Sequence, residues 1–125
     1  MKHIGLHSIA IQTNNAALAS MKDMYTTILG AKEVMELPGV VVLEMPNHFI
    51  VELYTEIADT PLYLFKDNKM VLGFWTDNIE AKFKQLKEEG YEILSPILQA
   101  GECYSYFHFT GPNEHVYMMK QSIKI

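Results

Sequence analysis

The stretch HSIAIQTNNA, residues 7–16, is a short apolar run that ends in a polar turn with two asparagines. The stretch VLGFWTDNIE, residues 71–80, repeats this pattern further along the chain. A short apolar run of this kind is typical of a strand, and asparagine is a favourable N-cap for a helix that follows at once. The repeat therefore predicts two similar modules, each of which begins with a strand that leads into a helix.

Helical periodicity follows both stretches. The first helix is expected to begin at residues 14–15 and to end at Gly30. The apolar face that it should pack into the core consists of Leu18, Met21, Tyr25, Ile28 and Leu29. The second helix is expected to begin at residues 77–78 and to end at Gly90. Its apolar face should consist of Ile79, Phe83 and Leu86.

The two halves of the chain also end alike, because each has a Pro-Asn pair that indicates a turn before a strand, at residues 46–47 and 112–113. The later strands are expected at Lys32–Leu37, Val40–Glu44, Phe49–Tyr54, Glu92–Leu98, Tyr104–Phe109 and His115–Lys120. We therefore expect one α+β domain over residues 1–125, built from two tandem βαβββ modules at about residues 3–56 and 69–121. A linker of about residues 57–68 joins them, and its apolar stretch 62–65 should pack against the domain or a second subunit.

Composition narrows the classes of function. The chain of 125 residues is 49% hydrophobic and has a formal net charge of −5, which disfavours nucleic acid as a partner and leaves room for a neutral or cationic ligand. Its single cysteine, Cys103, excludes an internal disulfide and favours a reducing compartment. No apolar run is long enough to cross a bilayer, and the first residues lack a signal-peptide pattern. We expect a cytoplasmic protein with no membrane partner.

Three segments resemble motifs of a known family: MYTTILG (residues 24–30), FWTDNIE (74–80) and FTGPNEH (109–115). They are similar to the F-Y-x-x-x-L-G helix end, the F-x-V-D-D-I-E strand-to-helix entry and the F-x-D-P-D-G-N turn of the glyoxalase, bleomycin-resistance and dioxygenase superfamily, the vicinal oxygen chelate fold. The resemblance covers nearly the whole chain. It implies a cupped mixed sheet with the helices on its convex side, and a homodimer. The last motif departs from the pattern at Glu114, where the family has glycine, so either Asn113 takes the left-handed conformation or the turn differs.

The resemblance also implies a metal site. Family members hold a divalent ion with side chains from the first and last strands of each module, which correspond here to His7, Glu52, Val71 and Met118. Histidine and glutamate suit this role, but a valine cannot ligate and a thioether is a poor ligand for hard divalent ions. No cofactor is therefore expected to be obligatory. A divalent metal (zinc, nickel, manganese or iron) would need a further ligand, for which His108 is the best candidate.

Strand alternation adds a set of expected ligand-binding side chains to these positions. If Glu52 faces a cavity, the same face should carry Tyr54, and the matching faces of the second module should carry Trp75, Tyr106, His108 and Met118. Glu52 interrupts an apolar strand, where a carboxylate is unfavourable unless it is paired, protonated or facing a polar cavity. Each histidine and aromatic residue of this set could instead have a purely structural role.

Two functions are compatible with these residues. The first is binding or sequestration of an aromatic or cationic small molecule without an obligatory metal, which the incomplete ligand set and the negative net charge favour. The second is a glyoxalase-like lyase or isomerase in which His7, Glu52 and His108 hold a divalent ion and Glu52 moves a proton. A metal-free enzyme would pair Glu52, as the base, with His7 or His108. Retention of both first-module residues favours an enzyme.

Overall fold

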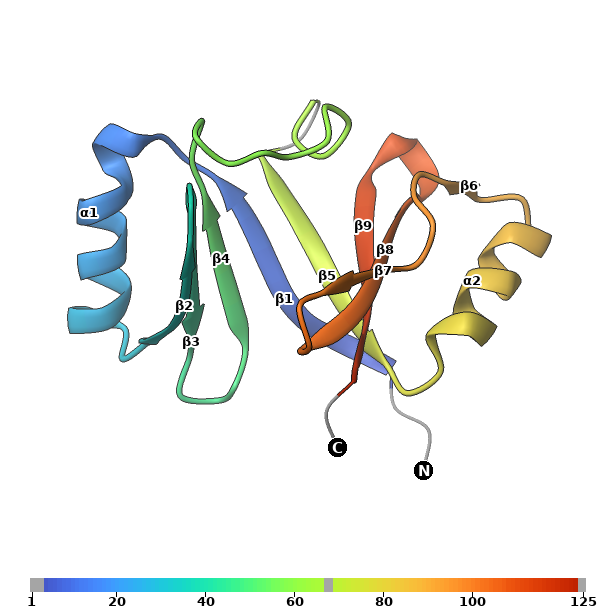
Figure 1. The fold of residues 1–125 in the computed structure, drawn as a ribbon, viewed down its shortest axis with the longest axis horizontal. Coiled ribbons are helices and arrows are strands. Elements are labelled where there is room, and N and C mark those ends of the chain that lie inside the picture. The colour runs from blue at the N-terminus through green and yellow to red at the C-terminus, as the bar shows by residue number, and fades with distance from the viewer. Residues whose placement is uncertain (1–3, 67–68, 124–125) are drawn as a thin grey trace. The chain divides into compact units, whose positions relative to one another are not determined.

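The computed structural model describes residues 4–66 and 69–123, and its fold is α+β, as predicted (Figure 1). The chain forms two compact units. The N-terminal unit consists of residues 8–70, and the C-terminal unit consists of residues 71–125 together with the first residues up to His7. The first strand, β1 (Ile4–Gln12), therefore contributes to both units. None of the described helices is both long and apolar enough to span a membrane.

The N-terminal unit is a mixed sheet with a helix on one face (Figure 1). After β1 its elements are α1 (Asn15–Asp23), the π-helical turn η1 (Met24–Ile28), β2 (Lys32–Leu37), β3 (Val40–Glu44) and β4 (Ile50–Tyr54). The strand order is β2-β3-β4-β1, in which β1 and β4 are parallel and the other neighbours antiparallel. The Asn14 side chain caps α1 by accepting a hydrogen bond of 2.8 Å from the Ala17 N–H, as expected of asparagine at this position.

The predicted apolar face of the first helix is correct over its first turns and wrong at its end. Leu18, Met21 and Tyr25 pack against the buried core of the unit, whose members are Ala31, Val41, Leu43, Val51 and Leu53. In contrast, Ile28 is 75% exposed and Leu29 is 45% exposed. The reason is η1, in which the Leu29 N–H donates to the Met24 carbonyl five residues earlier, at 3.2 Å. The wider turn changes the angular spacing of the residues, so 3.6-residue periodicity no longer predicts their direction.

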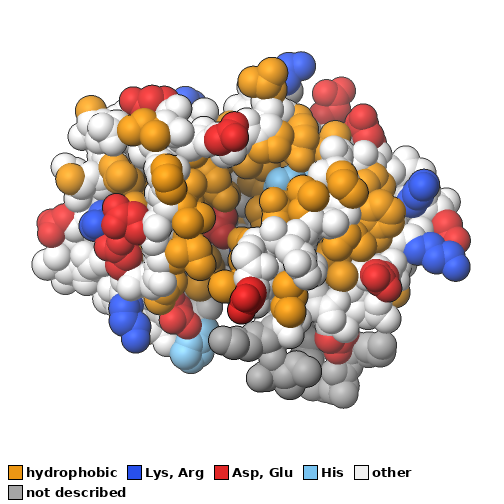
Figure 2. All heavy atoms as spheres, viewed as in Figure 1, with side chains coloured by type: hydrophobic (Ala, Val, Ile, Leu, Met, Phe, Trp, Pro, Cys, Tyr) orange, Lys and Arg blue, Asp and Glu red, His pale blue; other side chains and the backbone are white. Residues whose placement is uncertain are grey.

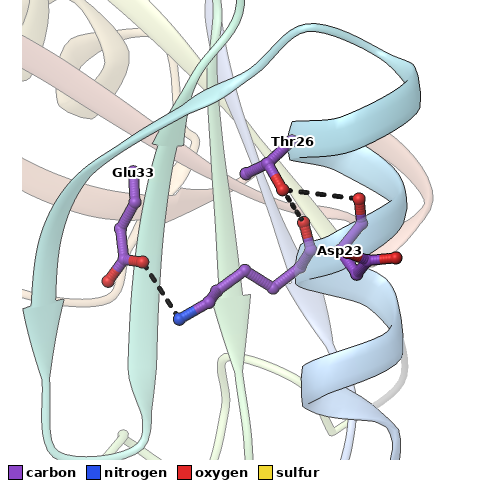
Figure 3. A network of polar contacts seen from close by, with 4 residues as sticks. Asp23, Thr26 and Glu33 are labelled. Atoms are coloured by element: carbon purple, nitrogen blue, oxygen red, sulfur yellow. Dashed lines mark hydrogen bonds and ion pairs between the residues drawn. The ribbon is translucent and has the colours of Figure 1, made fainter.

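Polar contacts accompany this change of helix geometry (Figure 3). The Thr26 hydroxyl donates to the Lys22 carbonyl at 2.9 Å and lies 3.4 Å from the Asp23 carbonyl. The Lys22 ammonium reaches across to strand β2, where it lies 3.0 Å from a carboxylate oxygen of Glu33. This hydrogen bond and the charge of Glu33 raise the pKa of Lys22. The ion pair between Lys22 and Glu33 thus links the end of the helix to β2.

The C-terminal unit repeats the arrangement with α2 against its sheet (Figure 1). Its elements are β5 (Met70–Thr76), α2 (Ile79–Glu88), β6 (Glu92–Ile93), β7 (Leu98–Ala100), β8 (Tyr104–Thr110), the 3-10 turn η2 (Pro112–Glu114) and β9 (Val116–Ser122). The strand order is β5-β9-β8-β6, with β5 parallel to β9, and β7 also pairs with β8. The predicted helix face is confirmed, because Ile79 is buried with Phe107, Phe109 and Met119, and Phe83 and Leu86 pack against them.

The single strand predicted at Glu92–Leu98 is wrong, because two short strands, β6 and β7, stand in its place. Pro96 lies between them and has no N–H to donate to a sheet ladder. At this interruption the Ser95 hydroxyl accepts a hydrogen bond of 3.1 Å from the His108 N–H, where a strand carbonyl would otherwise accept it. A proline inside an apolar run is thus a local signal that a strand is interrupted.

The two Pro-Asn turns are alike in backbone conformation, which supports the internal repeat. His48 has φ +72° and Glu114 has φ +62°, and each is the second residue after its proline. These are left-handed conformations, which are uncommon for residues other than glycine. Of the two alternatives left open by the sequence, Glu114 itself takes the left-handed conformation, and Asn113 does not.

The predicted linker packs in part against the N-terminal unit. Leu64 is 2% exposed, and the ring of Phe65 lies 5.4 Å from that of Tyr54, centroid to centroid. Leu62, in contrast, is 93% exposed. Residues 67 and 68 of the predicted linker lie outside the described residues.

Candidate functional site

The sheet of the C-terminal unit has one face on α2 and an opposite face that carries most of the predicted site residues. Phe107, Phe109 and Met119 lie on the helix face and form its core. Because side chains alternate along a strand, the neighbouring residues of β8 and β9 lie on the opposite face. We call this opposite face the site face. It carries Tyr106 and His108 from β8 and Met118 and Lys120 from β9.

Strand register arranges the site face in two rows across β5, β9 and β8. The first row consists of Trp75, Lys120 and Tyr106, and the second of Gly73, Met118 and His108. The ring centroids of Tyr106 and His108 are 5.5 Å apart, in an edge-to-face arrangement. Gly73 contributes no side chain to the second row.

Two further rings adjoin these rows. The imidazole of His7, from β1, lies 4.8 Å from the indole of Trp75, centroid to centroid. Tyr104 lies 5.9 Å from Tyr106 in the same measure, also edge to face. Of the predicted residues, the C-terminal unit thus places His7, Trp75, Tyr106, His108 and Met118 on one face or in contact with it.

Two titratable side chains are buried on the site face. His108 is 4% exposed and Lys120 is 1% exposed. Burial, and to a smaller extent the positive charge of Lys120, lower the pKa of His108 to about 4. His108 is therefore a neutral imidazole at pH 7, a form that can either donate or accept a hydrogen bond.

Lys120 was not among the residues predicted for the site. A lysine near the end of a strand is usually solvated, so its residue type alone does not indicate a site. The signal available was its spacing, because Lys120 lies two residues after Met118 and must share its face. Its Nζ atom lies 4.8 Å from the centroid of the Tyr104 ring, within the range of a cation–π contact.

The N-terminal unit holds the remaining predicted residues, Glu52 and Tyr54, on the face of its sheet opposite α1. Glu52 is 3% exposed, and the Tyr54 hydroxyl donates to its Oε1 atom at 3.1 Å. Its neighbours in register are Ala10 on β1 and Val42 on β3, neither of which offers a polar side chain. The hydrogen bond from the Tyr54 hydroxyl helps to orient this buried side chain.

The donor set does not fit the metal centre that the family resemblance implies. Val71 and Met118, which the resemblance aligns with two of the four ligand positions, are 1% and 4% exposed and are apolar. Over residues 4–66 and 69–123, no group of three or more histidine, cysteine, aspartate or glutamate side chains is arranged to hold a metal ion. Metal binding by His7, Glu52 and His108 stays a prediction.

On the face that Figure 2 shows, acidic and basic side chains are scattered mainly toward the margin, and the basic ones form no continuous patch there. Cys103 is exposed in the turn between β7 and β8, where its carbonyl accepts a hydrogen bond of 3.1 Å from the Ile123 N–H.

Comparison with known proteins places this geometry in context. Residues 5–119 match the model of the Glyoxalase/Bleomycin resistance protein/Dioxygenase superfamily. No curated protein matches the chain significantly.

Among solved structures, a hypothetical protein, BH1468, from Bacillus halodurans C-125 is 16% identical, with a TM-score of 0.73 over 95% of this chain and 94% of that one. A methylmalonyl-CoA epimerase from Mycobacterium tuberculosis is 13% identical, with a TM-score of 0.72 over 94% and 87%. A Mn(II)-bound glyoxalase from Novosphingobium aromaticivorans is 14% identical, with a TM-score of 0.72 over 98% of this chain and 40% of that one. At these identities the likeness shows the fold alone.

Proposed function

Since the chain belongs to the Glyoxalase/Bleomycin resistance protein/Dioxygenase superfamily, we propose that it is a small-molecule-binding member whose site works without an obligatory metal. The observation that carries this proposal is the site face, where Trp75 and Tyr106 flank Lys120. In the next row lies Met118, at a position where the family resemblance implies a metal ligand. Aromatic rings with a few polar groups among them are the usual lining of a small-molecule site.

The composition of the site face favours a flat, aromatic ligand. The indole of Trp75 and the ring of Tyr106 can stack on a planar molecule or contact its edge. The thioether of Met118 is flexible and polarizable, so it adapts to ligands of different outline. His108, neutral at pH 7, adds a hydrogen-bonding group that involves no charge.

Glu52 and Tyr54 of the N-terminal unit are further proposed binding residues on the strength of their own geometry. A buried carboxylate held by a tyrosine hydroxyl is an oriented acceptor. Such a group binds a hydroxyl or ammonium donor of a ligand more strongly than an exposed carboxylate does.

We expect replacement of Trp75 by alanine to weaken binding of aromatic compounds about tenfold or more, because it removes the largest apolar surface of the first row. Calorimetric titration with benzoate, benzamide and benzylamine measures this in the wild type and the variant. Tyr91→Ala is a matched control, since Tyr91 is an exposed aromatic residue beyond the site face. Equal affinities in the wild type and Trp75→Ala would refute the proposed site. Loss of ligand affinity in Glu52→Gln, titrated separately, would support the binding role proposed for Glu52.

Metal removal gives a second test. After dialysis against a chelator we expect no stoichiometric divalent ion in the protein and no gain in melting temperature on addition of nickel, zinc or manganese. A metal that binds the folded state at a hundredfold its Kd would stabilise it by about 2.7 kcal/mol, which a thermal melt detects easily. Retention of one ion per chain, lost in His7→Ala, would instead favour the alternative function, a metal-dependent lyase or isomerase using His7, Glu52 and His108.

The homodimer and the cytoplasmic location stay predictions. Apolar side chains that a second copy could cover are exposed on β2, in η1 and just after η1: Met24, Ile28, Leu29, Val34, Met35 and Leu37.

A further inference from the structure

A β-bulge interrupts the edge strand of the N-terminal unit. Strand β2 lies at the edge of its sheet, and its pairing with β3 shifts register between Glu33 and Met35. Glu33 lies opposite Leu43, whereas Met35 lies opposite Val42, so Val34 is the extra residue of the bulge. Beyond this point the alternation of side chains is offset by one residue, which changes the face that each of them reaches.

The bulge places both carboxylates of β2 on the face that packs against α1. Glu33 reaches across to the ammonium of Lys22, a residue of α1, at 3.0 Å (Figure 3). Glu36 lies opposite Val41, which belongs to the core on that same face. In a regular strand, residues 33 and 36 would lie on opposite faces, because three positions separate them.

The same offset brings two apolar side chains, Met35 and Leu37, to the opposite face. Register continues them across the sheet in two rows: Met35, Val42 and Glu52 in the first, and Leu37, Val40 and Tyr54 in the second. In a regular strand Met35 and Leu37 would share the helix face with Glu33. They are 36% and 52% exposed, so each offers apolar surface on the face of the proposed binding residues.

We propose that Met35 and Leu37 are specificity-determining residues, which contact an apolar substituent of a ligand that binds on this face beside Glu52 and Tyr54. This inference rests on the proposed function and names its ligand class, an aromatic compound with a flexible alkyl chain. Neighbouring strands are about 4.8 Å apart, so β2 lies roughly 10 Å from β4, and an alkyl chain on a ring can extend from one strand to the other. Bulges at sheet edges commonly re-aim side chains next to binding sites.

Titration calorimetry with benzamide and 4-butylbenzamide tests the inference. In the wild type we expect the butyl compound to bind about tenfold or more tightly, because its alkyl carbons leave water on contact with the two side chains. In Met35→Ser and in Leu37→Ser we expect most of this gain to be lost, because serine offers little apolar surface. The affinity for benzamide itself should stay within about twofold of the wild-type value, since benzamide lacks the alkyl chain.

Ile28→Ser is a matched control, because Ile28 is a 75% exposed apolar residue of the same unit that belongs to neither row. We expect this variant and Met35→Leu to keep the wild-type gain. Equal affinities of the two compounds in the wild type, an unchanged gain in both serine variants, or loss of the gain in Ile28→Ser would overturn the inference. Each of these results leaves the proposed function standing, because benzamide still binds.

The alternative occupant of this surface is a second copy of the chain. If sedimentation shows that the wild type is a dimer and that Leu37→Ser is a monomer, this side chain contacts another chain and the inference is overturned. Binding of neither compound by the wild type would instead contradict the proposed function itself. If circular dichroism shows that one serine variant does not fold, the other decides the inference.

Discussion

Replacement of Phe107 by alanine is expected to lower the free energy of unfolding by about 3–5 kcal/mol, the usual range for deleting a buried phenylalanine. Phe107 is fully buried, and its ring meets that of Phe83 from α2 edge to face at 5.0 Å between centroids. It lies on β8 between Tyr106 and His108, so it anchors to the helix the strand that carries both residues of the site face. Urea unfolding followed by circular dichroism measures the change.

Phe107→Leu is the matched control, since it keeps an apolar side chain at the same place and should be destabilised by only about 1–2 kcal/mol. An alanine variant no less stable than the leucine variant would mean that β8 is not held by this contact. The geometry further implies that the alanine variant binds ligand less well, because the positions of Tyr106 and His108 depend on the same strand.

Acidification is expected to destabilise the protein through His108. The pKa of His108 is about 4 in the folded chain, below its ordinary value of 6.5. Between these values the unfolded chain binds a proton that the folded chain does not, so protonation favours unfolding. The neutral imidazole of His108 therefore stabilises the folded chain fully above about pH 6.5, and this stabilisation is lost as the pH falls to about 4. The difference between these two pKa values corresponds to about 3 kcal/mol in the free energy of unfolding.

Urea unfolding of the wild type and of His108→Gln at about pH 7 and about pH 4 separates this contribution from that of the carboxylates. Both proteins share the titration of the acidic residues, and only the wild type has the imidazole. We expect the wild type to lose up to about 3 kcal/mol more than the variant over this interval. Parallel losses in the two proteins would show that the imidazole is solvated or paired differently in the folded state.

The elements that could be predicted from the sequence are those with local signals. Asn14 and Asn78 cap the two helices as expected, because an asparagine before a periodic apolar run is favourable whatever the rest of the chain does. The π-helical turn after α1 could not be predicted, since nothing in a single sequence distinguishes it from a further turn of α-helix. The break at Pro96, in contrast, has a local signal, because proline has no N–H to donate to a sheet ladder.

In the candidate site, too, some features could be predicted from local signals and others could not. Alternation along β8 and β9 correctly grouped Tyr106 with His108, because parity along a strand is a local property. The position of Lys120 between Trp75 and Tyr106 depends on the register of strands, and Trp75 is distant from it in sequence. Its burial arises only in the folded chain. Neither the low pKa of His108 nor the hydrogen bond between Tyr54 and Glu52 could be read from composition, since both arise from tertiary contacts.

The exposed turn at Cys103 makes the natural chain convenient for spectroscopy. Cys103 is the sole cysteine of the chain and Trp75 is its sole tryptophan. Both belong to the same compact unit. A thiol-reactive dye would attach at one defined point without any engineered residue. Energy transfer from the indole to that dye would then follow rearrangements inside this half of the molecule as a ligand is added.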